Sequence, residues 1–296
     1  MRERNENFLG RWALQPAELR QIVERALDED LAGYGDVTSQ VLISDQQRAR
    51  GKVLIQRSGV VAGLAVVREV FQVLDSEIRT EFFVADGALV APGVTVATVE
   101  GRAWAILAGE RTALNFLGKL SGIATRTRAF VEAVSGTKAV ILATRKTTPG
   151  LRLLEKYAVV CGGGQPHRFG LFDGILVKDN HRVLCGGIRF ALERLNSFAF
   201  RSLPIEVEVD TLEELKIALE FEVPWILLDN FSLSELRQAV ALVEGRARLE
   251  ASGGITLATV REVAETGVDA ISVGGLTHSA PYLDVSLVVE PLPFSA

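Results

Sequence analysis

The chain has 296 residues and a mass of 32.1 kDa, and its content of 48% hydrophobic and 23% charged residues excludes a disordered or fibrous protein. At about 150 residues per domain, this length predicts two domains. The net charge of -5 gives no overall field suited to nucleic acid, and two cysteines exclude a disulfide-stabilised secreted scaffold.

The N-terminal part of the chain has the pattern of a mixed α and β domain. The opening sequence MRERNENFLGRWALQ lacks the apolar core of a signal peptide, and no stretch approaches the ~20 apolar residues of a membrane helix, so we expect a cytoplasmic protein without membrane contact. Helical spacing covers 16–26 and 64–74, and strands are expected at 51–57, 78–84 and 94–99. From 103 to 134 we expect two amphipathic helices, broken near Ser121-Gly122.

After about residue 137, short apolar strands alternate with helices. Strands are expected at 139–143, 174–177, 205–209, 225–228, 248–251 and 270–273, and helices near 151–159, 188–195, 212–219, 233–243 and 257–264. Repeated βα units predict an α/β fold with a parallel sheet, closed into a barrel if the crossovers all wind one way. We therefore assign 1–136 to the N-terminal domain and 137–276 to the βα domain, with a tail, 277–296, that can pack back on the first.

Charged residues and glycine pairs follow these strands. The segment from 111 to 182 has 12 Lys and Arg against four acids, a charge of +8 that leaves -13 on the remainder. Charge counting alone favours a solvated basic face, so the placement of the charges has to decide. Parallel strands gather their carboxyl ends at one edge of the sheet, which brings the groups that follow them together. These groups are Thr144-Arg145-Lys146, Lys178, Glu208 and Asp210, Asp229-Asn230, Ser252-Gly253-Gly254 and Gly274-Gly275.

Taken together, these residues predict an anion site. Either glycine pair alone is an ordinary turn, but two of them ahead of helices are typical of a phosphate site, where amides without a Cβ approach the ligand. Glu208 and Asp229 suit ribose hydroxyls or Mg²⁺. Lys178 alone would also fit a Schiff-base aldolase, which leaves the other cations unexplained. Cys161 and Cys185 have no metal-ligand spacing, so we expect no zinc site.

Longer motifs extend over nearly the whole chain. They are EDL at 29–31, GDVT at 35–38, ERTALN at 110–115, ATRKTTPG at 143–150, CGGGQPHRFGLFDGILVKDNH at 161–181, EVEVD at 206–210, LLDN at 227–230, SGGI at 252–255 and ISVGGLTHSAP at 271–281. Through them the chain resembles the quinolinate phosphoribosyltransferase family, also called nicotinate-nucleotide pyrophosphorylase (carboxylating). Gln165-Pro166 and Gly275 depart from the expected motif, which affects loop shape and pocket fit but no charged group.

The resemblance implies a decarboxylating phosphoribosyltransferase that makes nicotinate mononucleotide, pyrophosphate and CO2 from quinolinate and phosphoribosyl pyrophosphate, with Mg²⁺, in de novo NAD biosynthesis. It implies an incomplete α/β barrel of six or seven parallel strands with an N-terminal α/β sandwich domain. It also implies a homodimer, with a higher assembly left open, in which Arg111 completes the active site of the neighbouring subunit.

The resemblance further implies roles for individual residues. Lys146, Lys178, Glu208 and Asp229 would be catalytic, with Glu208 and Asp229 reaching the metal through water and substrate phosphates. The expected substrate-binding residues are these four together with Arg111, Thr144, Arg145, His167, Arg168, Ser252, Gly253, Gly254, Val273, Gly274 and Gly275.

Three other functions stay open at this point. A paralogue of the same fold could use another aromatic acid without decarboxylation, although the cation set is intact. The aldolase hypothesis would be supported by borohydride trapping of Lys178. A non-catalytic phosphate-binding protein would bind tightly without turnover, but Glu208 and Asp229 would repel its anion.

Overall fold

The computed structural model describes residues 15–197 and 203–293. The opening segment, in which the sequence predicts no signal peptide, lies outside the described residues. The chain divides into two compact units. The first unit contains the described residues up to Arg128, Thr148–Gly163 and the described residues from Ala280 onward, and the second contains Ala129–Thr147 and Gly164–Ser279. Among the described residues, no helix has both the length and the apolar character needed to cross a membrane.

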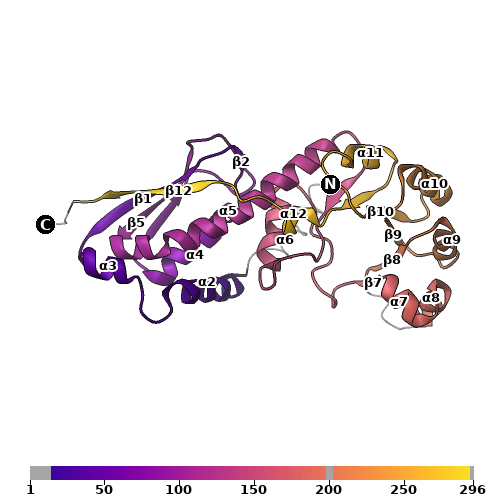
Figure 1. The fold of residues 1–296 in the computed structure, drawn as a ribbon, viewed down its shortest axis with the longest axis horizontal. Coiled ribbons are helices and arrows are strands. Elements are labelled where there is room, and N and C mark those ends of the chain that lie inside the picture. Colours follow the sequence, from indigo (N-terminus) through magenta and orange to yellow (C-terminus); the bar gives the residue numbers. More distant parts are fainter. Residues whose placement is uncertain (1–14, 198–202, 294–296) are drawn as a thin grey trace. The chain divides into compact units, whose positions relative to one another are not determined.

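The first unit is built on an antiparallel sheet (Figure 1). Its strand order is β12-β1-β5-β3, with β12 at Val285–Pro291, β1 at Arg48–Ile55, β5 at Thr95–Arg102 and β3 at Arg79–Phe82. Strands β2 (Gly59–Val60) and β4 (Leu89–Val90) form a separate antiparallel pair. The C-terminal strand β12 pairs with β1 from Ala49↔Pro291 to Ile55↔Val285, so residues at opposite ends of the sequence form one ladder.

Helices α2 (Pro16–Leu31), α3 (Val37–Leu42), α4 (Leu64–Leu74) and α6 (Arg152–Cys161) belong to the first unit, as does most of α5 (Ala103–Ala133). The predicted break in α5 near Ser121-Gly122 is wrong, because the helix is continuous. Ser121 is buried and its Oγ accepts the N–H of Ala62 over 3.0 Å. A Cβ on Gly122 would lie 2.0 Å from the carbonyl oxygen of Pro281. The two small residues therefore allow close packing of other segments on the helix.

The second unit contains a parallel sheet of six strands in the order β6-β11-β10-β9-β8-β7. The strands are β6 (Val140–Leu142), β7 (Ile175–Val177), β8 (Ile205–Val209), β9 (Trp225–Asp229), β10 (Arg248–Ser252) and β11 (Ala270–Ser272). Strands consecutive in sequence are neighbours throughout, except that β6 pairs with β11 and not with β7. The predicted incomplete α/β barrel is therefore confirmed, with six strands and an open seam between β6 and β7.

Gln165 covers part of the exposed edge of β6. Its backbone N–H donates to Ile141 O over 2.8 Å, and its carbonyl accepts the N–H of Ala143 over 2.8 Å. One residue of the segment between α6 and β7 thus makes the contacts of a single-residue strand. These bonds use only backbone atoms, so they do not require a particular side chain at position 165.

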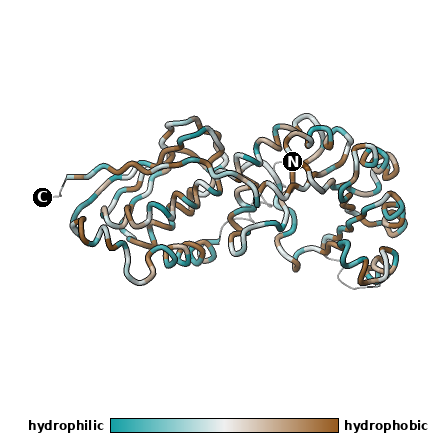
Figure 2. Tube along the Cα trace, in the orientation of Figure 1, coloured by the Kyte–Doolittle hydropathy of each residue, from teal (hydrophilic) through white to brown (hydrophobic). Residues whose placement is uncertain are grey.

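Helices follow the strands of the second unit and lie outside the sheet (Figure 1). They are α7 (Asp179–Cys185), α8 (Ile188–Ser197), α9 (Leu212–Glu220), α10 (Leu233–Val243), α11 (Val260–Glu265) and α12 (Gly275–His278). Hydrophobic and hydrophilic residues alternate along α9 and α10, as expected of helices with one face on a core (Figure 2). Ser232 and Glu235 form a reciprocal capping box at the start of α10, which fixes where that helix begins. Helix α7 was not predicted.

Candidate active site

The carboxyl ends of the six parallel strands lie along one edge of the second unit. Thr144-Arg145-Lys146 follow β6, Lys178 follows β7 and caps α7, and Glu208 lies within β8. Asp229 ends β9, Ser252 ends β10, and Val273 follows β11. The register places Ser252 beside Asp229, so adjacent strands end at the same level. The topology thus gathers the predicted polar groups, and side-chain contacts show which of them meet.

Lys178 and Glu208 form the tightest of these contacts. The Lys178 Nζ lies 2.5 Å from Glu208 Oε2, and the backbone N–H of Asp179 donates to Glu208 Oε1 over 3.3 Å. Glu208 is buried whereas 43% of the Lys178 side chain is exposed, so the ammonium is more open to solvent than the carboxylate. Both carboxylate oxygens have donors, which offsets the desolvation of the buried charge.

Two further carboxylates meet that of Glu208 at this pair. Ligand oxygens of Glu208, Asp210 and Asp229 lie within 4.8 Å of one another. Burial raises the pKa of Asp229, and the charge of Glu208 raises it further, while the charges of Lys178 and Lys146 act in the opposite direction. A divalent cation would relieve this repulsion, and carboxylate oxygens are ligands that Mg²⁺ prefers. The donor set therefore fits the predicted metal.

Lys146 lies across the glycine turn that follows β11. A Cβ on Gly274 would be 2.8 Å from Lys146 Cδ and 3.3 Å from His278 Nε2. The Thr277 hydroxyl donates to the Lys146 carbonyl over 2.7 Å, which ties the segment after β6 to α12. The bare backbone at Gly274 is therefore what leaves room for the lysine chain.

The second glycine turn requires glycine for two reasons. Gly253 and Gly254 have φ values of +100° and +59°, which L side chains rarely adopt. A Cβ on Gly253 would also lie 2.1 Å from Asn230 Oδ1. The helix predicted from residue 257 starts at Val260, three residues later than expected.

Arg145 and Arg168 form a cluster of cations near the open seam. Arg168 Nη1 donates to Gly174 O over 3.1 Å. Burial lowers the pKa of Arg168, and the charge of Arg145 lowers it further, which shows that the two guanidiniums repel each other. The buried Nε of Arg145 has no hydrogen-bond partner among the described residues. Two neighbouring guanidiniums suit a ligand that carries more than one carboxylate.

His167, which has a φ of +53°, faces two buried glutamates inside the barrel. Its Nε2 lies 3.0 Å from Glu206 Oε2 and 3.5 Å from Glu250 Oε2. Burial lowers the pKa of His167, but these carboxylates outweigh burial and raise it to about 9. The backbone N–H of Arg168 donates to Nδ1 over 2.7 Å, which opposes protonation, yet one N–H dipole counts for less than two carboxylates.

Sequence reasoning missed Glu250 and gave Glu206 no role. The available signal was charge inside short apolar strands, because Glu206 and Glu208 are two residues apart and so lie on one face of β8. Glu250 has the same relation to Ser252 on β10.

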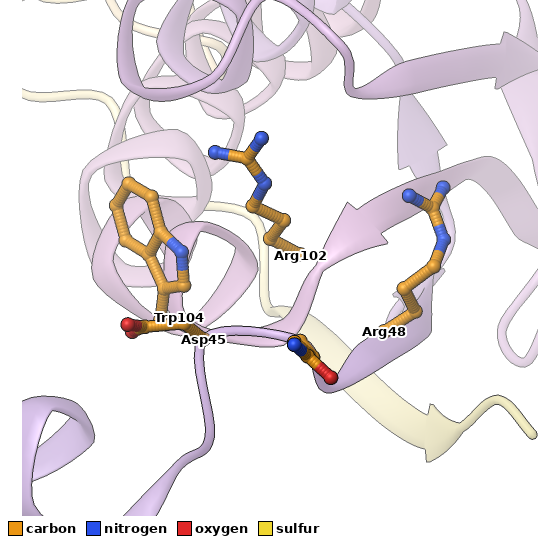
Figure 3. Close-up of a pocket in the computed structure, with 5 residues that line it drawn as sticks. Asp45, Arg48, Arg102 and Trp104 are labelled. Atoms are coloured by element: carbon orange, nitrogen blue, oxygen red, sulfur yellow. The ribbon is translucent and has the colours of Figure 1, made fainter. Parts of the chain in front are cut away.

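Arg111 lies on α5 in the first unit and is exposed. A cavity of about 570 Å³ in the first unit, lined by Asp45, Gln46, Arg48, Arg102 and Trp104, contains none of the predicted site residues (Figure 3).

Comparison with known proteins gives a match for each half of the chain. Residues 36–121 match the N-terminal domain of quinolinate phosphoribosyl transferase, and residues 123–288 match the C-terminal domain of the same family. The chain belongs to the quinolinate phosphoribosyltransferase family. The C-terminal match contains every predicted site residue except Arg111, which lies in the N-terminal match.

Individual members of the family match over most of their length. A probable nicotinate-nucleotide pyrophosphorylase (carboxylating) from Bacillus subtilis is 41% identical over 92% of this chain and 93% of its own. The chloroplastic nicotinate-nucleotide pyrophosphorylase (carboxylating) of Oryza sativa is 40% identical over 92% of this chain and 78% of its own. The crystal structure of NadC from Streptococcus pyogenes superposes with a TM-score of 0.90 at 38% identity, and covers 95% of this chain and 99% of that one. The expected family and fold are both confirmed.

Proposed function

We propose that this protein converts quinolinate and phosphoribosyl pyrophosphate to nicotinate mononucleotide, pyrophosphate and CO2 in the de novo synthesis of NAD. The observation that carries the proposal is the cluster in which Lys146 and Lys178 lie beside Glu208 and Asp229. Pyrophosphate leaving a sugar needs cations near the departing charge and carboxylates near the positive ribosyl centre. The cluster supplies both within one site.

Quinolinate is assigned to the cations nearest the open seam. Its two adjacent carboxylates would pair with Arg145 and Arg168, whose planar guanidiniums suit bidentate contact. Lys178 and the cationic ring of His167 would complete the protein's own share of this pocket. Thr144, whose hydroxyl oxygen accepts the N–H of Lys146 over 3.0 Å, would hold the loop that carries Arg145.

Phosphoribosyl pyrophosphate is assigned to the glycine turns and the acids. Lys146, the turn Ser252–Gly254 and the turn Val273–Gly275 would bind the 5′-phosphate and pyrophosphate, because bare backbone amides approach anions closely. Glu208 and Asp229 would hold the ribose hydroxyls, and would hold Mg²⁺ through water and the substrate phosphates. The bound metal would supply charge neutralisation on the pyrophosphate.

The proposed chemistry requires no protein nucleophile. The residues hold the quinolinate nitrogen against the anomeric carbon, and the C–O bond to pyrophosphate breaks as the N–C bond forms. The ring nitrogen is then cationic, so its charge stabilises the carbanion left at C2 when that carboxylate departs as CO2. A proton then bonds to C2 in place of the carboxylate. Positioning and electrostatics would supply most of the rate enhancement.

We also propose a homodimer in which Arg111 reaches the partner's site. Each unit has exposed apolar side chains that an interface could cover. In the first unit these include Tyr34 and Val41, both 81% exposed, and in the second they include Val183 at 76% and Leu184 at 85%. A higher assembly and a cytoplasmic location stay predictions.

The proposed function is tested by incubating the purified protein with quinolinate, phosphoribosyl pyrophosphate and Mg²⁺. We expect nicotinate mononucleotide and CO2 in equal amounts, and no product when any one component is left out. Phosphoribosyl transfer to another aromatic acid without CO2 would indicate the paralogue. Tight binding of phosphoribosyl pyrophosphate without turnover would indicate a binding protein.

The shared site is tested by mixing two inactive variants, Arg111→Ala and Arg145→Ala. If Arg111 acts in the partner's site, each mixed dimer has one site with both arginines intact. Random exchange then restores about a quarter of the wild-type activity. Mixtures that stay inactive after subunit exchange would refute the shared site, and near-normal activity of Arg145→Ala alone would refute its role with quinolinate.

A further inference from the structure

Asn230, the residue after β9, touches two parts of the site at once. Its Nδ2 donates to Asp229 Oδ2 over 2.8 Å, and its backbone N–H donates to the Ser252 carbonyl over 2.9 Å. A Cβ on Gly253 would lie 2.1 Å from Asn230 Oδ1 and 2.6 Å from its Cγ, so the amide rests directly on the bare glycine backbone. One exposed side chain therefore links an acid of the site to its glycine turn.

The backbone at this position restricts which residue can make these contacts. Asn230 has a φ of +57°, in the left-handed region that favours Gly, Asn and Asp. Glycine has no side chain, and an aspartate carboxylate accepts hydrogen bonds but cannot donate one to Asp229. Asparagine combines tolerance of this conformation with an N–H donor.

Asp229 has a particular need for such a donor. Its carboxylate lies with those of Glu208 and Asp210, and like charges at this separation repel each other. The Asn230 amide gives Oδ2 a hydrogen-bond donor, which fixes the orientation of the carboxylate.

We infer that Asn230 is a positioning residue for phosphoribosyl pyrophosphate: it orients the Asp229 carboxylate and supports the turn at Gly253. This inference rests on the proposed function, because it concerns how the same site binds that substrate. Asn230 acts through its neighbours and is assigned no contact with the reacting atoms. Hydrogen-bond partners that orient metal-ligating side chains commonly change affinity or activity by about 10- to 100-fold when removed.

The test uses two variants that keep the backbone conformation. Asn230→Gly removes the amide without left-handed strain, and Asn230→Asp keeps the shape but replaces the donor with an acceptor. We expect both to raise the KM for phosphoribosyl pyrophosphate by about 10- to 100-fold and to leave the KM for quinolinate unchanged. Calorimetry with phosphoribosyl pyrophosphate and Mg²⁺ alone should show the same loss of affinity, and the Tm of Asn230→Gly should not fall.

Glu222→Gly is the matched control. Glu222 is also exposed, has a φ of +54° and precedes the same strand, β9, at the end away from the site. The control should keep wild-type KM values for both substrates. An Asn230→Gly protein with wild-type affinity for phosphoribosyl pyrophosphate would overturn the inference, as would parallel losses of Tm and of affinity for both substrates.

The inference and the proposed function can fail separately. An active wild type whose Asn230→Gly variant keeps its KM for phosphoribosyl pyrophosphate overturns the inference alone. A wild type that forms no product overturns the proposed function, and calorimetry still decides whether Asn230 supports binding of phosphoribosyl pyrophosphate. A wild type that neither reacts with nor binds phosphoribosyl pyrophosphate overturns both.

Discussion

Replacement of Glu250 by glutamine should remove one of the two carboxylate charges that stabilise the cationic His167 ring. Glu250 is fully buried and its Oε2 lies 3.5 Å from His167 Nε2. At an effective dielectric constant of about 20, a unit charge at that distance is worth about 5 kcal/mol, or more than 3 pKa units. The pKa of His167 should therefore fall from about 9 to its ordinary value of 6.5 or lower in Glu250→Gln.

The same change should alter how stability depends on pH. Because the pKa of His167 is raised to about 9 in the folded protein, its contribution is complete below pH 6.5 and is lost as the pH rises through about 9. At about 1.4 kcal/mol per pKa unit, the contribution is roughly 3 kcal/mol. Wild-type stability should include this decline between pH 6 and pH 9.5, and Glu250→Gln should lack most of it.

The chain has three histidines, so NMR titration of the ring signals can follow His167 separately from the other two. Denaturant unfolding at the two pH values measures the stability change. Glu262→Gln, an exposed change on α11, serves as the control and should leave the titration unaltered. A wild-type pKa near 6.5, or the same pKa in both proteins, would refute the electrostatic argument.

Three further changes test other parts of the structure. Lys178→Met should lower kcat by ~100- to 1,000-fold in a steady-state assay, because it removes a cation from the site and leaves Glu208 without its ammonium partner. A variant that keeps half of the wild-type activity would exclude this role for Lys178. Gly122→Ala should lower the free energy of unfolding by about 1–3 kcal/mol in a urea titration, because the new methyl group would lie 2.0 Å from Pro281 O. An unchanged urea midpoint would contradict the packing described for α5. The Leu184 side chain is 85% exposed. If α7 lies in the proposed dimer interface, Leu184→Glu should shift the sedimentation coefficient toward that of the monomer without loss of the helical circular dichroism signal. An unaltered dimer would place the interface elsewhere.

Local sequence patterns predicted most of the regular structure. Strand β8 and helix α10 have the bounds that the apolar pattern predicted, and the remaining strands of the second unit differ by one or two residues at their ends. Helix α7 was missed because its seven residues show little periodicity and follow Lys178 without a loop. The predicted break in α5 failed because Ser and Gly, which are turn residues in isolation, here serve close packing. The boundary near residue 136 stays a prediction.

The sequence alone determined that the βα units form a parallel sheet, and hence that the groups after its strands lie along one edge. Side-chain period is a local property, and the alternation of strands with helices along the chain requires parallel pairing. It could not determine which groups touch. The contacts of His167 with Glu206 and Glu250, of Lys146 with Gly274 and of Asn230 with Gly253 join residues from different strands. Such pairs depend on register, on inward or outward orientation and on bare backbone at a distant position. Only the folded sheet specifies these together, because each contact needs two segments to be placed to within an ångström or so.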